Sequence, residues 1–140
     1  MQRILVPRPE ALDVLKEVRT RGYTTGLISD CSADVPEVWA ATPLVPFFDV
    51  AIFSCIAGVT KPDPLSYHLA CAHLGVPAYD CRYVGDGGSH ELGGAAAVGM
   101  PAALLRVPQE TSEETDRAGE EDWLGPTVST LREVLRWLET

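Results

Sequence analysis

Short apolar segments alternate with amphipathic segments along most of this chain, and glycine or proline residues separate them. Apolar runs typical of buried strands occupy residues 23–29, 50–55, 82–84 and 102–107. Apolar residues at helical spacing occupy residues 9–21, 63–75 and 90–98, and the proline-punctuated stretch 36–46 is predicted to hold one short helix. Strands that alternate with helices favour a mostly parallel α/β sheet over a β-sandwich.

Residues that start and stop helices mark several of these boundaries. Asp63 and Pro64 are typical of an N-cap and a first helical turn. Gly22, Gly75 and Gly99 each follow a predicted helix, where a left-handed residue ends it. A last amphipathic helix is expected at about residues 127–138.

The size and composition predict one domain over residues 1–140. The chain has 140 residues, of which 46% are hydrophobic and 22% charged, which suffices for one hydrophobic core. No apolar run approaches the roughly 20 residues of a membrane helix, and the first residues do not resemble a signal peptide. We therefore expect a cytoplasmic protein without a membrane partner.

The charge balance is acidic and uneven. Twenty acidic against 11 basic residues give a net charge of −9, which argues against a nucleic-acid partner. Residues 109–122 hold seven acids and one arginine, a run that is predicted to be a solvated loop. A cation site and a docking segment are the alternatives for this acidic loop.

The cysteines do not form a metal-binding or redox motif in the sequence. Cys31, Cys55, Cys71 and Cys81 contain no C-x-x-C pair, so they are interpreted as reduced thiols.

Polar residues follow three of the predicted strands. Ser29 and Asp30 follow the first, Lys61 lies in a proline-framed turn after the second, and Asp86 and Glu91 follow the third. Ligands of parallel α/β sheets bind at the carboxyl ends of the strands. A hydroxyl, an ammonium and two carboxylates together suit a phosphoryl group with a hard divalent cation. Taken singly, Lys61 is also compatible with a solvated turn residue, and Asp86 with a turn or N-cap residue.

Together these segments resemble the second, third and fourth motifs of the haloacid dehalogenase-like hydrolases, a superfamily dominated by magnesium-dependent phosphatases. The matching segments are Gly26-Leu27-Ile28-Ser29-Asp30, then Lys61-Pro62-Asp63-Pro64, and then Gly85-Asp86 with Glu91 and Ala96-Ala97-Val98-Gly99-Met100. The resemblance covers about residues 9–107 and implies a three-layer, Rossmann-like α/β core.

The resemblance also implies a role for each matched residue. Ser29 and Lys61 are the expected catalytic residues, and with Asp30 they are expected to bind the phosphoryl group. Asp86 and Glu91 are the expected Mg²⁺ ligands. Two positions differ from the family pattern, because Asp30 stands where Asn is usual and Glu91 where Asp is usual.

The family's first motif, D-x-D-x-T at the end of the central strand, has no counterpart here. Its first aspartate attacks phosphorus and forms an aspartyl-phosphate, whereas the first aspartate of this chain is Asp13, inside a predicted helix. We therefore expect a sheet that is incomplete at its N-terminal strand. We also expect the chain to be catalytically inactive alone. A complementing chain or self-association could cover the open sheet. The implied function is a Mg²⁺-dependent phosphatase of a small phosphorylated metabolite. The alternative is a catalytically inactive module that binds an anion or a partner.

Overall fold

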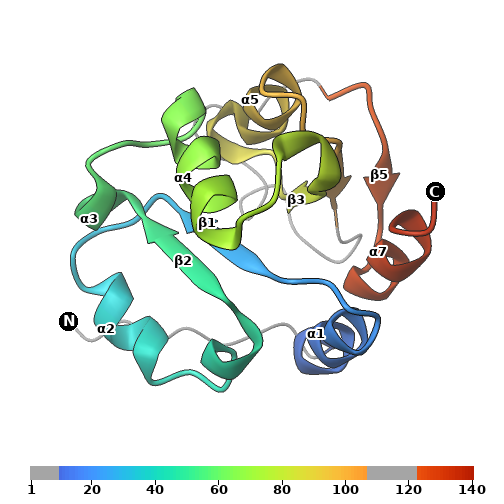
Figure 1. Cartoon of the computed structure of the whole chain (residues 1–140), viewed down its shortest axis with the longest axis horizontal. Helices are drawn as coiled ribbons and strands as arrows, with labels where there is room; N and C mark the ends of the chain where they lie inside the picture. Colours follow the sequence, from blue (N-terminus) through green and yellow to red (C-terminus); the bar gives the residue numbers. More distant parts are fainter. Residues whose placement is uncertain (1–9, 107–122) are drawn as a thin grey trace.

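The strands of the computed structural model, which describes residues 10–106 and 123–140, form two parallel sheets (Figure 1). In the first sheet, β1 (Gly26–Ser29) pairs with β2 (Val50–Phe53), so that Ile28 lies opposite Ile52. In the second sheet the order is β3 (Tyr83–Gly85), β4 (Ala102–Leu105) and β5 (Thr127–Val128). The parallel α/β prediction is confirmed.

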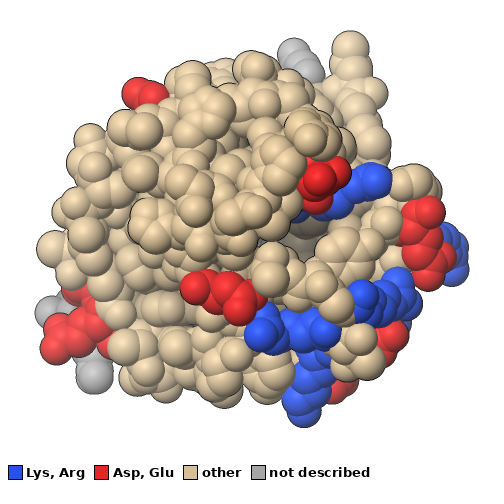
Figure 2. Space-filling view, viewed as in Figure 1, with Lys and Arg blue, Asp and Glu red and all other residues tan. Residues whose placement is uncertain are grey.

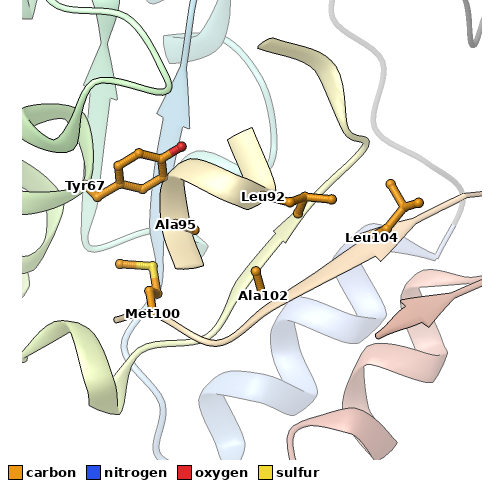
Figure 3. Close-up of a cluster of buried hydrophobic side chains, with 6 residues drawn as sticks. All are labelled: Tyr67, Leu92, Ala95, Met100, Ala102 and Leu104. Atoms are coloured by element: carbon orange, nitrogen blue, oxygen red, sulfur yellow. The ribbon is translucent and has the colours of Figure 1, made fainter. Parts of the chain in front are cut away.

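Helices cover these strands in two layers. One layer holds α4 and α5, which contact each other; α4 also contacts β1 and β2, and α5 contacts β3 and β4. On the other side of the strands α1 and α7 lie side by side (Figures 1 and 3). The bounds of the described α-helices are α1 (Ala11–Thr20), α2 (Val35–Ala40), α3 (Ser54–Ala57), α4 (Pro64–Leu74), α5 (Glu91–Ala97) and α7 (Leu131–Trp137). Short 3-10 turns occupy Val45–Phe47, Ala78–Asp80 and Gly88–His90.

One hydrophobic cluster joins the two sheets. Figure 3 shows its buried members, which are Tyr67, Leu92, Ala95, Met100, Ala102 and Leu104. Ile28 of β1 and Tyr83 of β3 both pack against this cluster. In the described part of the chain no strand pairing links β1 to β3. The sheet is therefore interrupted between two strands that share a core, as the prediction of an incomplete sheet requires.

The caps of α4 form as its sequence predicts. The Asp63 carboxylate accepts a hydrogen bond from the Leu65 N–H, with 2.9 Å between nitrogen and oxygen. Gly75 ends the helix with φ +71°, a left-handed conformation that glycine adopts without the Cβ penalty. This helix starts three residues after Lys61 and so fixes the position of the Lys61 turn.

The predicted strand over residues 23–29 begins only at Gly26. At two other places the structure has a different element from the predicted one. The predicted helix at about residues 127–138 begins only at Leu131, because Thr127 and Val128 form β5 and pair with Leu104 and Leu105. The predicted strand over residues 50–55 ends at Phe53, and the following residues form α3. In both places a short apolar run fits either period, and packing against the rest of the molecule decides between them.

The acidic loop at residues 109–122 lies outside the described residues, and the single-domain interpretation stays a prediction. Among the residues that the structure describes, none of the helices has the length and apolar character needed to cross a membrane.

Candidate active site

Lys61 lies where the loops that follow β1 and β2 meet. Its ammonium group donates to the carbonyl oxygen of Ile28 at 3.3 Å and to Oε1 of Glu91 at 3.1 Å. Its backbone N–H donates to Oδ1 of Asp30 at 3.1 Å. The side chain is only 12% exposed, so its charge is held in place rather than free in solvent. The structure therefore does not support the interpretation of Lys61 as a solvated turn residue.

Glu91, the first residue of α5, is the partner that balances this charge. The residue is 4% exposed, and its Oε1 also accepts a hydrogen bond from the Tyr83 hydroxyl at 2.6 Å. The other oxygen, Oε2, accepts from the backbone N–H of Gly87 at 2.9 Å. A buried carboxylate is stable only where it is paired and hydrogen-bonded, and here both oxygens are.

Gly85, which belongs to the matched fourth motif, and Tyr83, which the sequence analysis did not single out, shape the surroundings of this carboxylate. A Cβ on Gly85 would lie 2.4 Å from Cδ of Glu91, so only glycine leaves room for the carboxylate against β3. Burial and the neighbouring Glu91 carboxylate raise the pKa of Tyr83, which keeps its hydroxyl protonated as a donor. The position of Tyr83 in the predicted strand at residues 82–84, just before the Gly85-Asp86 motif, was the available signal.

The hydroxyl of Tyr67 ties the site to the core. This fully buried residue donates to the backbone carbonyl of Glu91 at 2.7 Å, and its ring packs edge-on against Tyr83 with 5.6 Å between ring centroids. Tyr67 and Tyr83 together hold both ends of Glu91, which fixes the partner of Lys61.

The turn between β3 and α5 uses a left-handed backbone at three positions. Gly87, Ser89 and His90 have φ of +95°, +58° and +53°. Serine and histidine rarely adopt this conformation, which is found preferentially where a site needs a particular geometry. Here the turn places Glu91 directly beneath β3.

The remaining predicted residues lie around this group. Ser29 is the half-buried last residue of β1, and Asp30 joins the group through the Lys61 backbone. Asp86 follows β3, and its Oδ1 accepts a hydrogen bond from the Gly88 N–H at 3.1 Å. The hydrogen bonds thus bring Asp30, Lys61 and Glu91 together, while Ser29 adjoins them at the end of its strand.

The described residues do not make a complete magnesium site on their own. Within residues 10–106 and 123–140, no three His, Cys, Asp or Glu side chains are grouped closely enough to hold a metal ion. Both Glu91 oxygens already accept hydrogen bonds. Mg²⁺ requires several oxygen ligands in octahedral geometry, so further ligands are needed here.

A separate hollow of about 430 Å³ lies away from this edge of the sheet. It is lined by Arg21, Arg132 and Arg136 together with Glu133 and Glu139. Figure 2 shows basic side chains gathered on one side of the molecule. Arg21 follows α1 and precedes β1, so the hollow lies toward the amino end of β1, and acidic partners already pair with Arg21. It is therefore not part of the candidate active site.

Comparison with known proteins gives the same family as the motifs. The sequence model of the haloacid dehalogenase-like hydrolases matches residues 2–99. The chain is 30% identical to a phosphoserine phosphatase of Thermus thermophilus over 98 residues, which are 69% of this chain and 39% of that protein. It is 29% identical over 129 residues to the human haloacid dehalogenase-like hydrolase domain-containing protein 3, covering 92% of this chain and 51% of that protein.

Solved structures show the same fold. A phosphatase of this superfamily from Thermococcus onnurineus superposes with a TM-score of 0.78 at 25% identity, over 94% of this chain and 57% of that one. The L-2-haloacid dehalogenase of Xanthobacter autotrophicus gives 0.75 at 22% identity, over 96% of this chain and 62% of that one. The chain spans about half the length of the curated relatives it matches. Its matched motifs, fold and relatives show that the chain belongs to the haloacid dehalogenase-like hydrolase family.

Proposed function

We propose that this chain forms the later part of the catalytic core of a phosphatase that acts on a small phosphorylated metabolite. The observation that carries this proposal is the Lys61 ammonium, held at the carboxyl end of β1 by Ile28 and Glu91. A positioned positive charge at this edge suits the transferring phosphoryl group. Relatives named as phosphatases support this reaction class.

We assign each site residue of this chain a role from its position. Ser29 at the end of β1 supplies a hydroxyl for a phosphoryl oxygen. Lys61 supplies the positive charge, and Asp30 orients the Lys61 turn by accepting its backbone N–H. Glu91 acts as the counter-ion that keeps Lys61 in place; because its oxygens are occupied, we assign it this role rather than that of a metal ligand.

The sequence contains no D-x-D-x-T motif, so we infer that the nucleophile comes from a further strand. We place this completing strand between β1 and β3, because no pairing joins these two strands in the part of the chain described. A parallel strand there would use the open hydrogen-bonding edges of both, as strand addition does in other proteins. The D-x-D-x-T motif at its end would then face Lys61. A longer form of the protein or a second polypeptide would supply this strand.

Magnesium is the proposed cofactor of the completed site. Asp86 is the ligand that this chain contributes, and the completing strand contributes further carboxylates. Bound Mg²⁺ would neutralise charge on the phosphoryl group.

The test is complementation of the full chain. A segment with an apolar strand followed by D-x-D-x-T is fused ahead of the chain, and hydrolysis of p-nitrophenyl phosphate is measured with Mg²⁺ and with a chelator. We expect Mg²⁺-dependent turnover from the fusion and none from the chain alone. The matched control changes the first aspartate of the added motif to asparagine and should be inactive.

Two outcomes contradict the proposal. Mg²⁺-dependent turnover by the chain alone, lost in Asp86→Asn, would place the nucleophile within the chain. The second outcome is a fusion that shows no turnover but whose melting temperature rises with vanadate, with the rise lost when Lys61 is substituted. That result would favour the anion-binding module instead.

A further inference from the structure

Two cysteines that are distant in the sequence meet beside the candidate active site. The Sγ atoms of Cys31 and Cys55 lie 3.8 Å apart, although 24 residues separate them. Cys31 directly follows Asp30, whose carboxylate holds the Lys61 turn, and Cys55 lies in α3, just before that turn. The sequence has no C-x-x-C motif, so only the fold brings this thiol pair together.

The backbones that carry the two thiols are already fixed against each other. Ser54, which precedes Cys55, accepts a hydrogen bond from the Cys31 N–H at 2.8 Å and donates one to the Cys31 carbonyl at 3.3 Å. A disulfide bond needs about 2.05 Å between sulfur atoms. The two sulfur atoms, now 3.8 Å apart, therefore need a further approach of roughly 1.8 Å.

We propose that Cys31 and Cys55 are a site of reversible disulfide formation, with a small disulfide such as oxidised glutathione as the oxidant. Cys55 is exposed and Cys31 is half-buried, so Cys55 reacts first. Its thiolate attacks the reagent, forms a mixed disulfide and releases one glutathione thiolate. The Cys31 thiolate then attacks the Cys55 sulfur and releases the second glutathione. Two cysteine thiols are oxidised, and one oxidised glutathione is reduced to two glutathione molecules.

The bond would link the end of β1 to the start of α3 and so tie both ends of the segment between them. It would reduce the conformational entropy of the unfolded chain across this loop and so stabilise the folded state. It would also hold Asp30 and the Lys61 turn at a fixed separation. This inference does not rest on the proposed phosphatase activity.

A second thiol pair in the same chain offers a matched control. Cys71 and Cys81 lie 3.9 Å apart but are both half-buried. The pKa is raised for Cys55, by desolvation and by the neighbouring Cys31, and for Cys81, to about 11. The two pairs therefore differ in access, because Cys55 is exposed whereas Cys71 and Cys81 are both half-buried. We therefore expect the Cys31–Cys55 pair to react first.

The test compares two double variants of the full chain under oxidised glutathione. Cys71→Ser/Cys81→Ser keeps the proposed pair and should lose both free thiols, form no disulfide-linked dimer and retain no glutathione. It should also melt at a higher temperature until dithiothreitol reverses the change. Cys31→Ser/Cys55→Ser should keep both its thiols over the same time. A retained glutathione adduct, an unreacted pair, a cross-linked dimer or equal reactivity of the two variants would overturn the proposal.

The parent protein gives the same test without substitution. Chymotrypsin cleaves after Trp39, Phe53, Tyr67 and Tyr79, so the four cysteines fall on separate peptides. A disulfide-linked peptide pair containing Cys31 and Cys55 is expected in the oxidised sample. A pair that joins either of them to Cys71 or Cys81 would contradict the assignment.

Discussion

Lys61 and Glu91 form a nearly buried ion pair, with 3.1 Å between Nζ and Oε1 and side chains only 12% and 6% exposed. Lys61 lies in the turn after β2 of the first sheet, and Glu91 begins α5, which packs on β3 and β4 of the second sheet. Their pairing therefore fixes the second sheet relative to the first at the edge where the candidate site lies.

Breaking this pair on one side should destabilise the protein strongly. Glu91→Gln leaves the Lys61 ammonium without its counter-ion, and we expect a loss of about 3 kcal/mol in the free energy of unfolding. The measurement is urea denaturation of the full chain. The double variant Lys61→Met/Glu91→Gln should lose less than the sum of the two single variants. Additive losses would show that the two charges do not interact.

Tyr83→Phe should remove a hydrogen bond while keeping the ring contact with Tyr67. The lost bond is to a charged oxygen, so we expect a cost of about 1.5 to 3 kcal/mol in unfolding free energy. Tyr79→Phe is the matched control, because Tyr79 is 73% exposed, and it should have no effect. Equal effects of the two substitutions would contradict the role given to Tyr83.

The contribution of Tyr83 should also depend on pH. Its pKa is raised in the folded state by burial and by Glu91, so folding favours the protonated form. An unfolded tyrosine titrates near pH 10, so the parent's advantage over Tyr83→Phe is complete below about pH 10 and declines above it. Unfolding free energies from pH 8 upward test this; an advantage that grows above pH 10 would contradict it.

Gly85→Ala should disturb Glu91 directly. The new Cβ would lie 2.4 Å from the Glu91 Cδ, and the carboxylate would have to leave Lys61 and Tyr83. We expect a loss of about 2 kcal/mol in unfolding free energy, of the size that overpacking causes. In a Glu91→Ala background the same substitution should cost much less. A similar cost in both backgrounds would place the strain elsewhere.

Away from the site, Asp49 should make the protein sensitive to acid. Its Oδ2 accepts hydrogen bonds from Arg19 at 2.7 Å and from the Thr25 N–H at 2.8 Å, and these lower its pKa. The stability that it contributes is present above the unfolded pKa of about 3.9 and is lost as pH falls through the lower folded value. Because the pair is about one third exposed, Asp49→Asn should cost on the order of 1 kcal/mol at pH 7. The difference from the parent should shrink toward pH 2.

The sequence predicts well those elements whose ends are chemically marked. The caps of α4 at Asp63 and Gly75 are local, so they are visible without the fold. β5 is not, because two residues become a strand only by pairing with β4. A local signal was nevertheless present, since Thr130 caps α7 by accepting from the Glu133 N–H. Thr130 and Glu133 have the spacing of a capping box.

In the candidate site, too, the sequence predicts local features but not the contacts that depend on the fold. The motifs predict that Lys61 and Glu91 lie at the strand ends. They do not predict that the Glu91 oxygens accept hydrogen bonds from Lys61, Tyr83 and Gly87. Those contacts depend on how β3 and α5 pack. The meeting of Cys31 with Cys55 is likewise a product of the fold.

The two lysines of the chain allow the most direct test of the phosphatase proposal. In the chain completed by the first-motif segment, kcat for p-nitrophenyl phosphate is compared between Lys61→Met and Lys16→Met, the latter an exposed position on α1. The account predicts a fall in kcat of on the order of 100-fold or more for Lys61→Met and no change for Lys16→Met. A completed and folded Lys61→Met variant that keeps the parent's kcat would contradict it.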